Sequence, residues 1–199
     1  MLEFLLNTDT RLFLLINGWH SPFFDVLMTF ISAKLFWLPL YLLLLWLIIR
    51  EYGKKTWILL LFITAVLVLT DQVSVHLFKN VFQRLRPCHD PGLSTLVHIV
   101  NNHCGGKYSF VSSHATNVFG IVAFTYGLLG KRYKWLVWIL LVWGVLVMFS
   151  RVYLGVHYPG DVLAGAVVGM IIGSLLLSAY RYADKKWFRS RSEANTESK

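Results

Sequence analysis

The segment 150–161 holds a cation, an imidazole and a carboxylate within twelve residues, between two strongly apolar segments. Charged groups beside membrane-spanning segments are costly to keep there and are usually functional. Asp161 follows His157 by four residues, so its carboxylate can hold one ring nitrogen and leave the other free to attack. The alternative is an ordinary helix-start aspartate, stabilised by the helix dipole. The spacing predicts a nucleophilic histidine.

Three fixed cations, Lys79, Arg86 and Arg151, lie near the ends of apolar segments. Arginine binds phosphate oxygens through two parallel hydrogen bonds, and lysine acts as a point charge. The alternative for each side chain is a simple extension toward lipid headgroups. Together the three cations predict a site that holds a phosphoryl group and stabilises charge during its transfer.

A second histidine, His114, follows Ser112 and Ser113 where an apolar segment begins. Unpaired backbone N–H groups at a helix start can receive an anion. The alternative is a structural capping histidine. Asn117 lies one turn later, and Asp71 lies about two turns before Lys79. We expect both side chains to contact the site residues without binding the phosphate themselves. Asp71 also suits pairing with another span.

The composition places the chain in the membrane class. Its 199 residues are 56% hydrophobic and 15% charged, with a mean hydropathy of +0.58, whereas soluble domains are about 25% charged. The net charge of +9 could indicate nucleic acid binding. The cations lie in short loops and in the tail instead of along one face, so we expect the bilayer as a partner and no nucleic acid.

The apolar runs predict an all-α polytopic membrane bundle of five to six transmembrane helices with an N-terminal amphipathic segment. Residues 1–33 combine an amphipathic helix with a piece too short to span alone, forming either a hairpin or one broken crossing. The membrane core is expected over 34–182. Gly165, Gly169 and Gly173 suit close packing within one chain, so no oligomer is predicted. The five spans are 35–49, 57–78, 115–129, 135–149 and 162–180.

Alternation of the spans sorts the polar segments into two sets. Loops 50–55 and 131–134 are rich in Lys and Arg, so they and the polar tail 183–199 are expected to be cytoplasmic. Loops 79–112 and 150–160 then face outward, which brings together three polar stretches: 79–87, 112–114 and 150–161. The sequence therefore predicts a multi-pass membrane protein with its site on the extracytoplasmic face.

Both cysteines, Cys88 and Cys104, fall in the long polar loop. In an oxidising compartment a disulfide is favoured, stabilising the fold by about 3 kcal/mol. The alternatives are two unpaired thiols, or a zinc site with His89 and His103, whose spacing fits no recognised ligand pattern. We predict the disulfide and no metal.

The three polar stretches resemble the three-part signature of the type 2 phosphatidic acid phosphatase superfamily. That superfamily includes membrane lipid phosphatases, undecaprenyl-diphosphate phosphatases, glucose-6-phosphatase and soluble vanadium haloperoxidases. The first and third parts match in residue type and spacing, but Ser113 replaces the glycine of the usual Pro-Ser-Gly-His. The matching residues are Lys79-x6-Arg86-Pro87, Ser112-Ser113-His114 and Ser150-Arg151-x5-His157-x3-Asp161.

The resemblance implies a mechanism without metal or cofactor. His157, oriented by Asp161, would attack phosphorus and form a phosphohistidine. His114 would protonate the leaving oxygen and then help to activate water. The phosphate itself would be bound by Lys79, Arg86, Ser112, Ser113 and Arg151.

The resemblance, together with the small size, implies an integral membrane lipid phosphatase of a bacterial-type envelope, in the inner (plasma) membrane with its site on the periplasmic face. Undecaprenyl diphosphate, phosphatidate, phosphatidylglycerol phosphate and lipid A phosphate fit the residues equally well, because the signature specifies only the phosphoryl group. Haloperoxidase chemistry is disfavoured by the many spans. A phospholipid-binding or transport protein without hydrolysis is the other alternative, and the two histidines argue against it because binding needs only cations.

Overall fold

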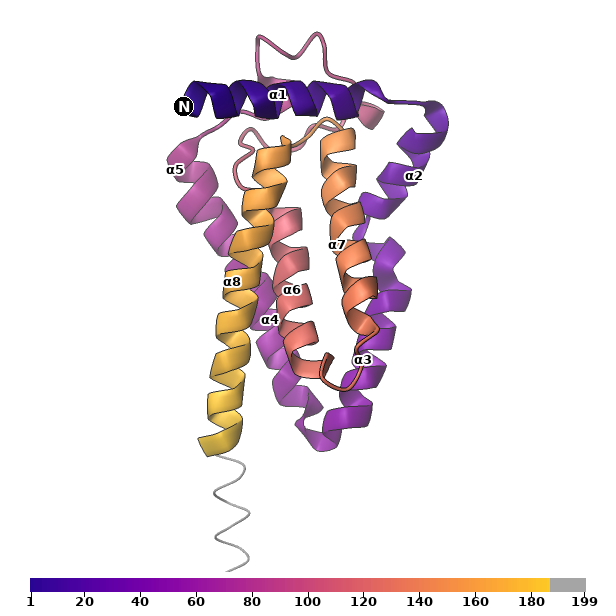
Figure 1. The fold of residues 1–199 in the computed structure, drawn as a ribbon, viewed down its shortest axis with the longest axis vertical. Coiled ribbons are helices and arrows are strands. Elements are labelled where there is room, and N and C mark those ends of the chain that lie inside the picture. The colour runs from indigo at the N-terminus through magenta and orange to yellow at the C-terminus, as the bar shows by residue number, and fades with distance from the viewer. Residues whose placement is uncertain (187–199) are drawn as a thin grey trace, which may run out of the picture.

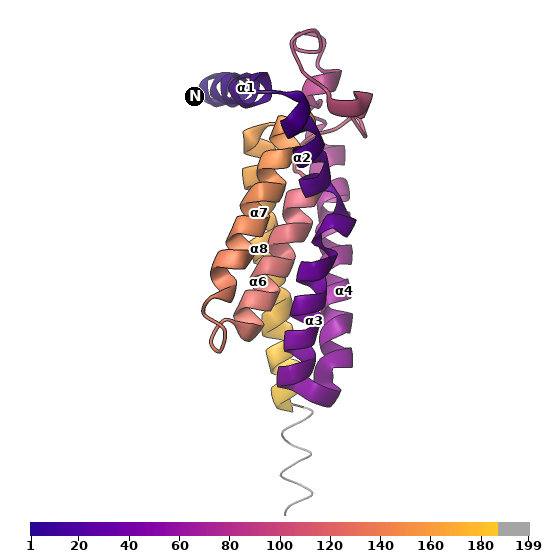
Figure 2. The ribbon, with the colours of Figure 1, turned by 90° about the vertical axis from the view of Figure 1, so that its right-hand side faces the viewer.

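A computed structural model describes residues 1–186, which are almost entirely helical. Most helices run side by side along the long axis, and α1 lies across one end of them (Figures 1 and 2). The predicted tail 183–199 lies outside the described residues from position 187 onward. The α-helices are α1 Leu2–Gly18, α2 Pro22–Ser32, α3 Leu38–Tyr52, α4 Thr56–Gln72, α5 Asn80–Phe82, α6 Ser113–Leu129, α7 Leu136–Tyr153 and α8 Pro159–Asp184.

The N-terminal segment contains two differently placed helices. In α1, Phe13 is completely buried while Phe4, Leu5 and other apolar side chains are exposed, as expected for an amphipathic helix. The next helix begins at Pro22, a favoured first position. Figure 1 shows α2 and α3 following one another down the same side of the bundle.

A helical stretch of 49 residues, Lys34–Phe82, contains an 18-residue window with a mean hydropathy of 2.2. It reverses at Gly53, whose φ of +50° lies in the left-handed region that favours glycine. As a result α3 and α4 run antiparallel (Figure 2). After α4 the helix widens into the π-helix Val73–Lys79, which is the element that carries one of the predicted phosphate-binding residues.

Helices α6 and α8 approach each other very closely. A Cβ atom on Gly165 would lie 2.8 Å from the Ser112 carbonyl oxygen, and one on Gly169 would lie 2.9 Å from the Gly120 nitrogen. Small residues at this spacing let two helix backbones touch. The glycine row therefore packs α8 onto α6 within one chain and brings the N-terminal ends of these helices together.

Within residues 1–186, three helical stretches could cross a membrane by length and composition: Lys34–Phe82, Leu136–Tyr153 and Pro159–Asp184. The all-α membrane architecture is confirmed, and the number of five to six spans stays a prediction. Figure 1 places the α3–α4 and α6–α7 turns at one end, and the connection before α6 with the α7–α8 turn at the other. The polar stretches thus share one end of the bundle, while its orientation in the membrane stays a prediction.

Candidate active site

His157 lies in the turn between α7 and α8 and is 1% exposed. Its Nδ1 is 3.2 Å from the Ser109 Oγ. Burial, followed by the charges of Arg86, Arg151 and Lys79, lowers the pKa of His157 well below its ordinary value. The imidazole is therefore neutral at neutral pH, which is the form with a lone pair available for attack.

Ser109 stands between the histidine and the carboxylate. Its hydroxyl donates a short hydrogen bond to Asp161 Oδ2, so its oxygen is left to accept the proton of His157 Nδ1. The direct distance from Nδ1 to Asp161 Oδ2 is 3.7 Å, longer than a hydrogen bond. Asp161 therefore orients the ring through Ser109 and not by the direct contact that we expected. Nε2 remains free.

The Asp161 carboxylate is completely buried and has several partners. Oδ2 also accepts from the Tyr158 backbone nitrogen at 2.9 Å, and Oδ1 accepts from Arg84 Nη1 at 3.0 Å. A buried carboxylate needs such charged and N–H donors to offset its lost hydration. Asp161 thus caps the start of α8 and contacts Ser109, which lies beside His157.

Replacing Ser109 with alanine is expected to lower kcat by about 10- to 100-fold, because the His157 ring loses its fixed orientation and its Nδ1 proton loses an acceptor. Phosphate release from a phosphorylated lipid measures the effect. Ser178→Ala, which removes an exposed hydroxyl on the same bundle, should keep wild-type kcat. Equal rates for Ser109→Ala and wild type would show that the hydroxyl does not orient the ring.

Lys79 reaches the start of α6. Its Nζ donates to Ser113 Oγ at 2.7 Å, and Ser74 Oγ lies 2.7 Å from the same oxygen. In a π-helix, hydrogen bonds join residue i to i+5, so Ser74 and Lys79 lie one above the other and meet one hydroxyl. Ser113, which replaces the family glycine, thus holds the ammonium group beside the helix N-terminus.

Arg86 is 7% exposed, and the loop backbone fixes its guanidinium. Nη1 donates to the Cys104 carbonyl at 2.8 Å, and Nε donates to the Tyr108 carbonyl at 3.3 Å. Burial lowers the pKa of Arg86, which stays a cation. Cys88 and Cys104 are joined in a disulfide. This bond restrains the Cys104 backbone, whose carbonyl orients the Arg86 guanidinium.

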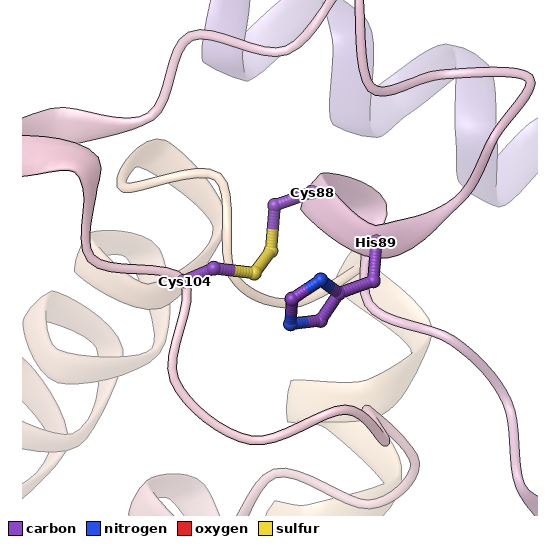
Figure 3. Close-up of side chains that lie close together, drawn as sticks. All are labelled: Cys88, His89 and Cys104. Carbon is purple, nitrogen blue, oxygen red and sulfur yellow. A yellow bond between two sulfur atoms is a disulfide. The ribbon is translucent and has the colours of Figure 1, made fainter.

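The ligand atoms of Cys88, His89 and Cys104 lie within 4.8 Å of one another. Figure 3 shows the imidazole beside the bond between the two sulfur atoms. Sulfur atoms in a disulfide are not thiolates, and the thiolate is the form that binds metal. This cluster therefore does not act as a metal site in the oxidised protein.

Two of the predicted phosphate-binding residues carry buried polar atoms without a protein partner. Arg151 donates from Nη1 to Ser32 Oγ, but its Nε has no hydrogen-bond partner among residues 1–186. Within the same described range, Ser112 Oγ is also unpaired. Buried polar groups are nearly always paired. Phosphate oxygens would satisfy both atoms.

His114 is the second residue of α6, and it lines a cavity of about 770 Å³ between α3, α4, α6 and α7. Asp71 and Asn117 line the same cavity. Asn117 Oδ1 accepts from Thr70 Oγ1 at 2.6 Å, so it links α6 to α4. The apolar lining includes Leu44, Leu45, Ile48, Leu60, Ile63, Leu67, Val68, Val118 and Ile121.

The structure adds four residues that the sequence did not single out for the site. Ser109, Arg84, Tyr158 and Asp9 all contact Asp161 directly or through one another. Ser109 and Asp161 are 52 residues apart, so spacing carries no signal of their contact. Arg84 offers only its position beside Arg86 as a hint.

The chain is similar in sequence to a known family and to several known proteins. The family model described as the PAP2 superfamily matches residues 55–185. The lipid A 4′-phosphatase of Bacteroides thetaiotaomicron is 36% identical over 197 residues, which cover 97% of this chain and 84% of that protein. The undecaprenyl-diphosphatase BcrC of Bacillus subtilis is 32% identical over 166 residues, covering 83% and 78%.

A solved structure has the same fold. The crystal structure of a transmembrane PAP2-type phosphatidylglycerolphosphate phosphatase from Bacillus subtilis superposes with a TM-score of 0.64 at 25% identity. The match covers 92% of this chain and 89% of that one. Together with the matched family model, these similarities show that the chain belongs to the PAP2 superfamily and is a membrane lipid phosphate phosphatase.

Proposed function

We propose that the protein removes a phosphate from lipid A through a phosphohistidine intermediate, without metal. The observation that carries the chemistry is the orientation of His157: its Nδ1 is engaged by Ser109 at 3.2 Å, which leaves Nε2 as the nucleophile. A protein that only bound phosphate would need cations but no oriented imidazole.

The first step transfers the phosphoryl group to the protein. The Nε2 lone pair of His157 attacks phosphorus, and the bond from phosphorus to the lipid oxygen breaks. His114 gives its proton to that oxygen, so the lipid leaves as an alcohol. Three cations, Lys79, Arg86 and Arg151, offset the negative charge that spreads over the phosphoryl oxygens.

The second step regenerates the histidine. His114, now neutral, takes a proton from water as the water oxygen attacks phosphorus. The bond between phosphorus and Nε2 breaks, inorganic phosphate leaves, and His114 is again protonated. The same residue thus serves as acid and then as base, as a double displacement requires.

The lipid tail has a candidate place beside this chemistry. His114 lines the cavity of about 770 Å³, whose walls are otherwise mostly apolar. An acyl chain of a membrane lipid lies in hydrocarbon before it binds, so an apolar lining lets it enter the cavity without exposure to polar groups. The cavity therefore suits a substrate whose phosphate reaches His157 while a hydrocarbon chain remains among α3, α4 and α6.

Lipid A is favoured as the substrate by the extent of two similarities. The lipid A 4′-phosphatases of Bacteroides thetaiotaomicron and Porphyromonas gingivalis align with 97% and 98% of this chain, which includes α1 and the polar loop over the site. Undecaprenyl diphosphate is the second candidate, since a relative with that activity aligns with 83% of the chain. We place the site on the periplasmic face, from the cytoplasmic charge bias of the opposite loops.

Purified protein in detergent with EDTA is expected to release phosphate from lipid A faster than from undecaprenyl diphosphate or phosphatidate. The cations of the site provide the charge stabilisation that a metal provides elsewhere, so EDTA should not lower the rate. Colorimetric phosphate assays on the three lipids, with and without EDTA and added Mg²⁺, make the measurement. A rate that EDTA abolishes and Mg²⁺ restores would contradict the mechanism, and faster release from either other lipid would contradict the substrate.

A further inference from the structure

Arg84 links the Asp161 carboxylate to α1, the helix that lies across this end of the bundle. Its Nη1 lies 3.0 Å from Asp161 Oδ1, and its Nη2 lies 2.8 Å from Asp9 Oδ2 in α1. Its guanidinium carbon lies 3.8 Å from the centre of the Tyr158 ring. The Arg84 carbonyl also accepts from the Ser109 backbone nitrogen at 2.8 Å. One residue therefore contacts both groups that orient His157.

Asp9 connects Arg84 to the start of α8. Its Oδ1 accepts from the Gly160 backbone nitrogen at 2.7 Å. A Cβ atom on Gly160 would lie 2.8 Å from Asp9 Oδ2, so only glycine lets the carboxylate approach this closely. The α1 helix is held there by Phe13, which is completely buried and whose ring meets that of Tyr158 at 5.4 Å.

The three charged groups are shielded from water to different degrees. Their side chains are 21% exposed for Arg84, 14% for Asp9 and 0% for Asp161. Charges in such surroundings interact more strongly than charges at an open surface. The planar guanidinium can bind the two carboxylates at once and lie flat on the aromatic ring, whereas a lysine cannot do all three.

We propose that Asp9 and Arg84 are positioning residues for phosphoryl transfer, and that α1 thereby completes the catalytic site. Asp9 holds one arm of the Arg84 guanidinium, so the other arm stays on Asp161. Asp161 in turn holds Ser109, and Ser109 holds the His157 ring. This inference rests on the proposed histidine nucleophile. It goes further by giving the N-terminal helix a part in the rate of the reaction, beyond its contact with the membrane.

The test uses variants that keep the fold. Asp9→Asn keeps the shape of the side chain and an oxygen for Gly160 but removes the charge that holds Arg84. It is expected to lower kcat by about 10-fold, and Arg84→Gln by about 100-fold, each with KM within about 2-fold of wild type, because orientation is lost while the phosphate-binding cations remain. The double variant should match Arg84→Gln alone, because Asp9 acts only through Arg84.

Glu3→Gln is the matched control, since Glu3 is an exposed acid in the same helix and should leave kcat unchanged. Full-length variants are purified in detergent, checked by thermal unfolding, and assayed for phosphate release from lipid A, undecaprenyl diphosphate and phosphatidate over a range of lipid mole fractions. If Asp9→Asn kept the wild-type kcat, the inference would be overturned while the proposed function stood. The same would follow if the two single-variant losses in kcat multiplied in the double variant. A wild-type protein that releases no phosphate from any of these lipids would overturn the proposed function and the inference with it.

Discussion

Replacing His157 with alanine is expected to reduce phosphate release by about 10,000-fold or more, because no other group can form the covalent intermediate. The imidazole is almost wholly buried, and Nδ1 already has its partner in Ser109. The three cations that we propose to bind the phosphate would remain in place. The variant should therefore still bind lipid phosphate while turnover is lost.

Two measurements check this result. Phosphate release gives kcat, and co-sedimentation with vesicles that contain the lipid substrate gives binding. His103→Ala is the matched control, because His103 is an exposed histidine of the polar loop and should keep wild-type turnover. Wild-type protein quenched during turnover with ³²P-labelled lipid should carry an acid-labile phosphoryl group that His157→Ala lacks. Unchanged release by His157→Ala would refute the mechanism.

Replacing His114 with alanine is expected to lower kcat by about 100- to 10,000-fold with a lipid substrate, since the leaving alcohol then departs without a proton. The loss should be much smaller with p-nitrophenyl phosphate. Nitrophenolate is a stable anion that leaves without protonation, so the first step no longer needs an acid. The loss in kcat that remains with p-nitrophenyl phosphate would measure the role of His114 as the base that activates water.

The ratio of the two losses distinguishes an acid from a binding residue. His76→Ala serves as the control, because His76 is exposed on the π-helix that also carries Lys79. Initial rates of phosphate release are measured for both substrates at saturation. Equal losses of His114→Ala on the lipid and on p-nitrophenyl phosphate would mean that His114 contacts the phosphate and does not protonate the leaving group.

Part of this site was predictable because it depends on local spacing. The mean hydropathy of +0.58 indicated membrane helices, and the positions of the polar stretches between apolar runs placed them at one end of a bundle. His157 and Asp161 lie in one turn and the following helix start, so their proximity follows from four residues of separation. The glycine row in α8 likewise reported close helix packing, which the contacts of Gly165 and Gly169 confirm.

Other contacts were not predictable because they join segments that are far apart in the chain. Asp9 meets Gly160 across 151 residues, and Ser109 meets Asp161 across 52. Asn117 lines the same cavity as His114, and its hydrogen bond to Thr70 of the neighbouring helix could not be read from the spacing. Such contacts depend on how helices rotate and tilt when they pack, which no residue spacing within one segment reports.

The sequence by itself determined the membrane class and the phosphatase family and predicted the residue types for the reaction, because hydropathy and motif spacing are properties of contiguous segments. Only the tertiary structure decided how these residues act on one another. It placed a serine between His157 and Asp161, and it brought Arg84 and α1 onto the same carboxylate. The physical reason is that a buried carboxylate takes its donors from whichever elements pack around it.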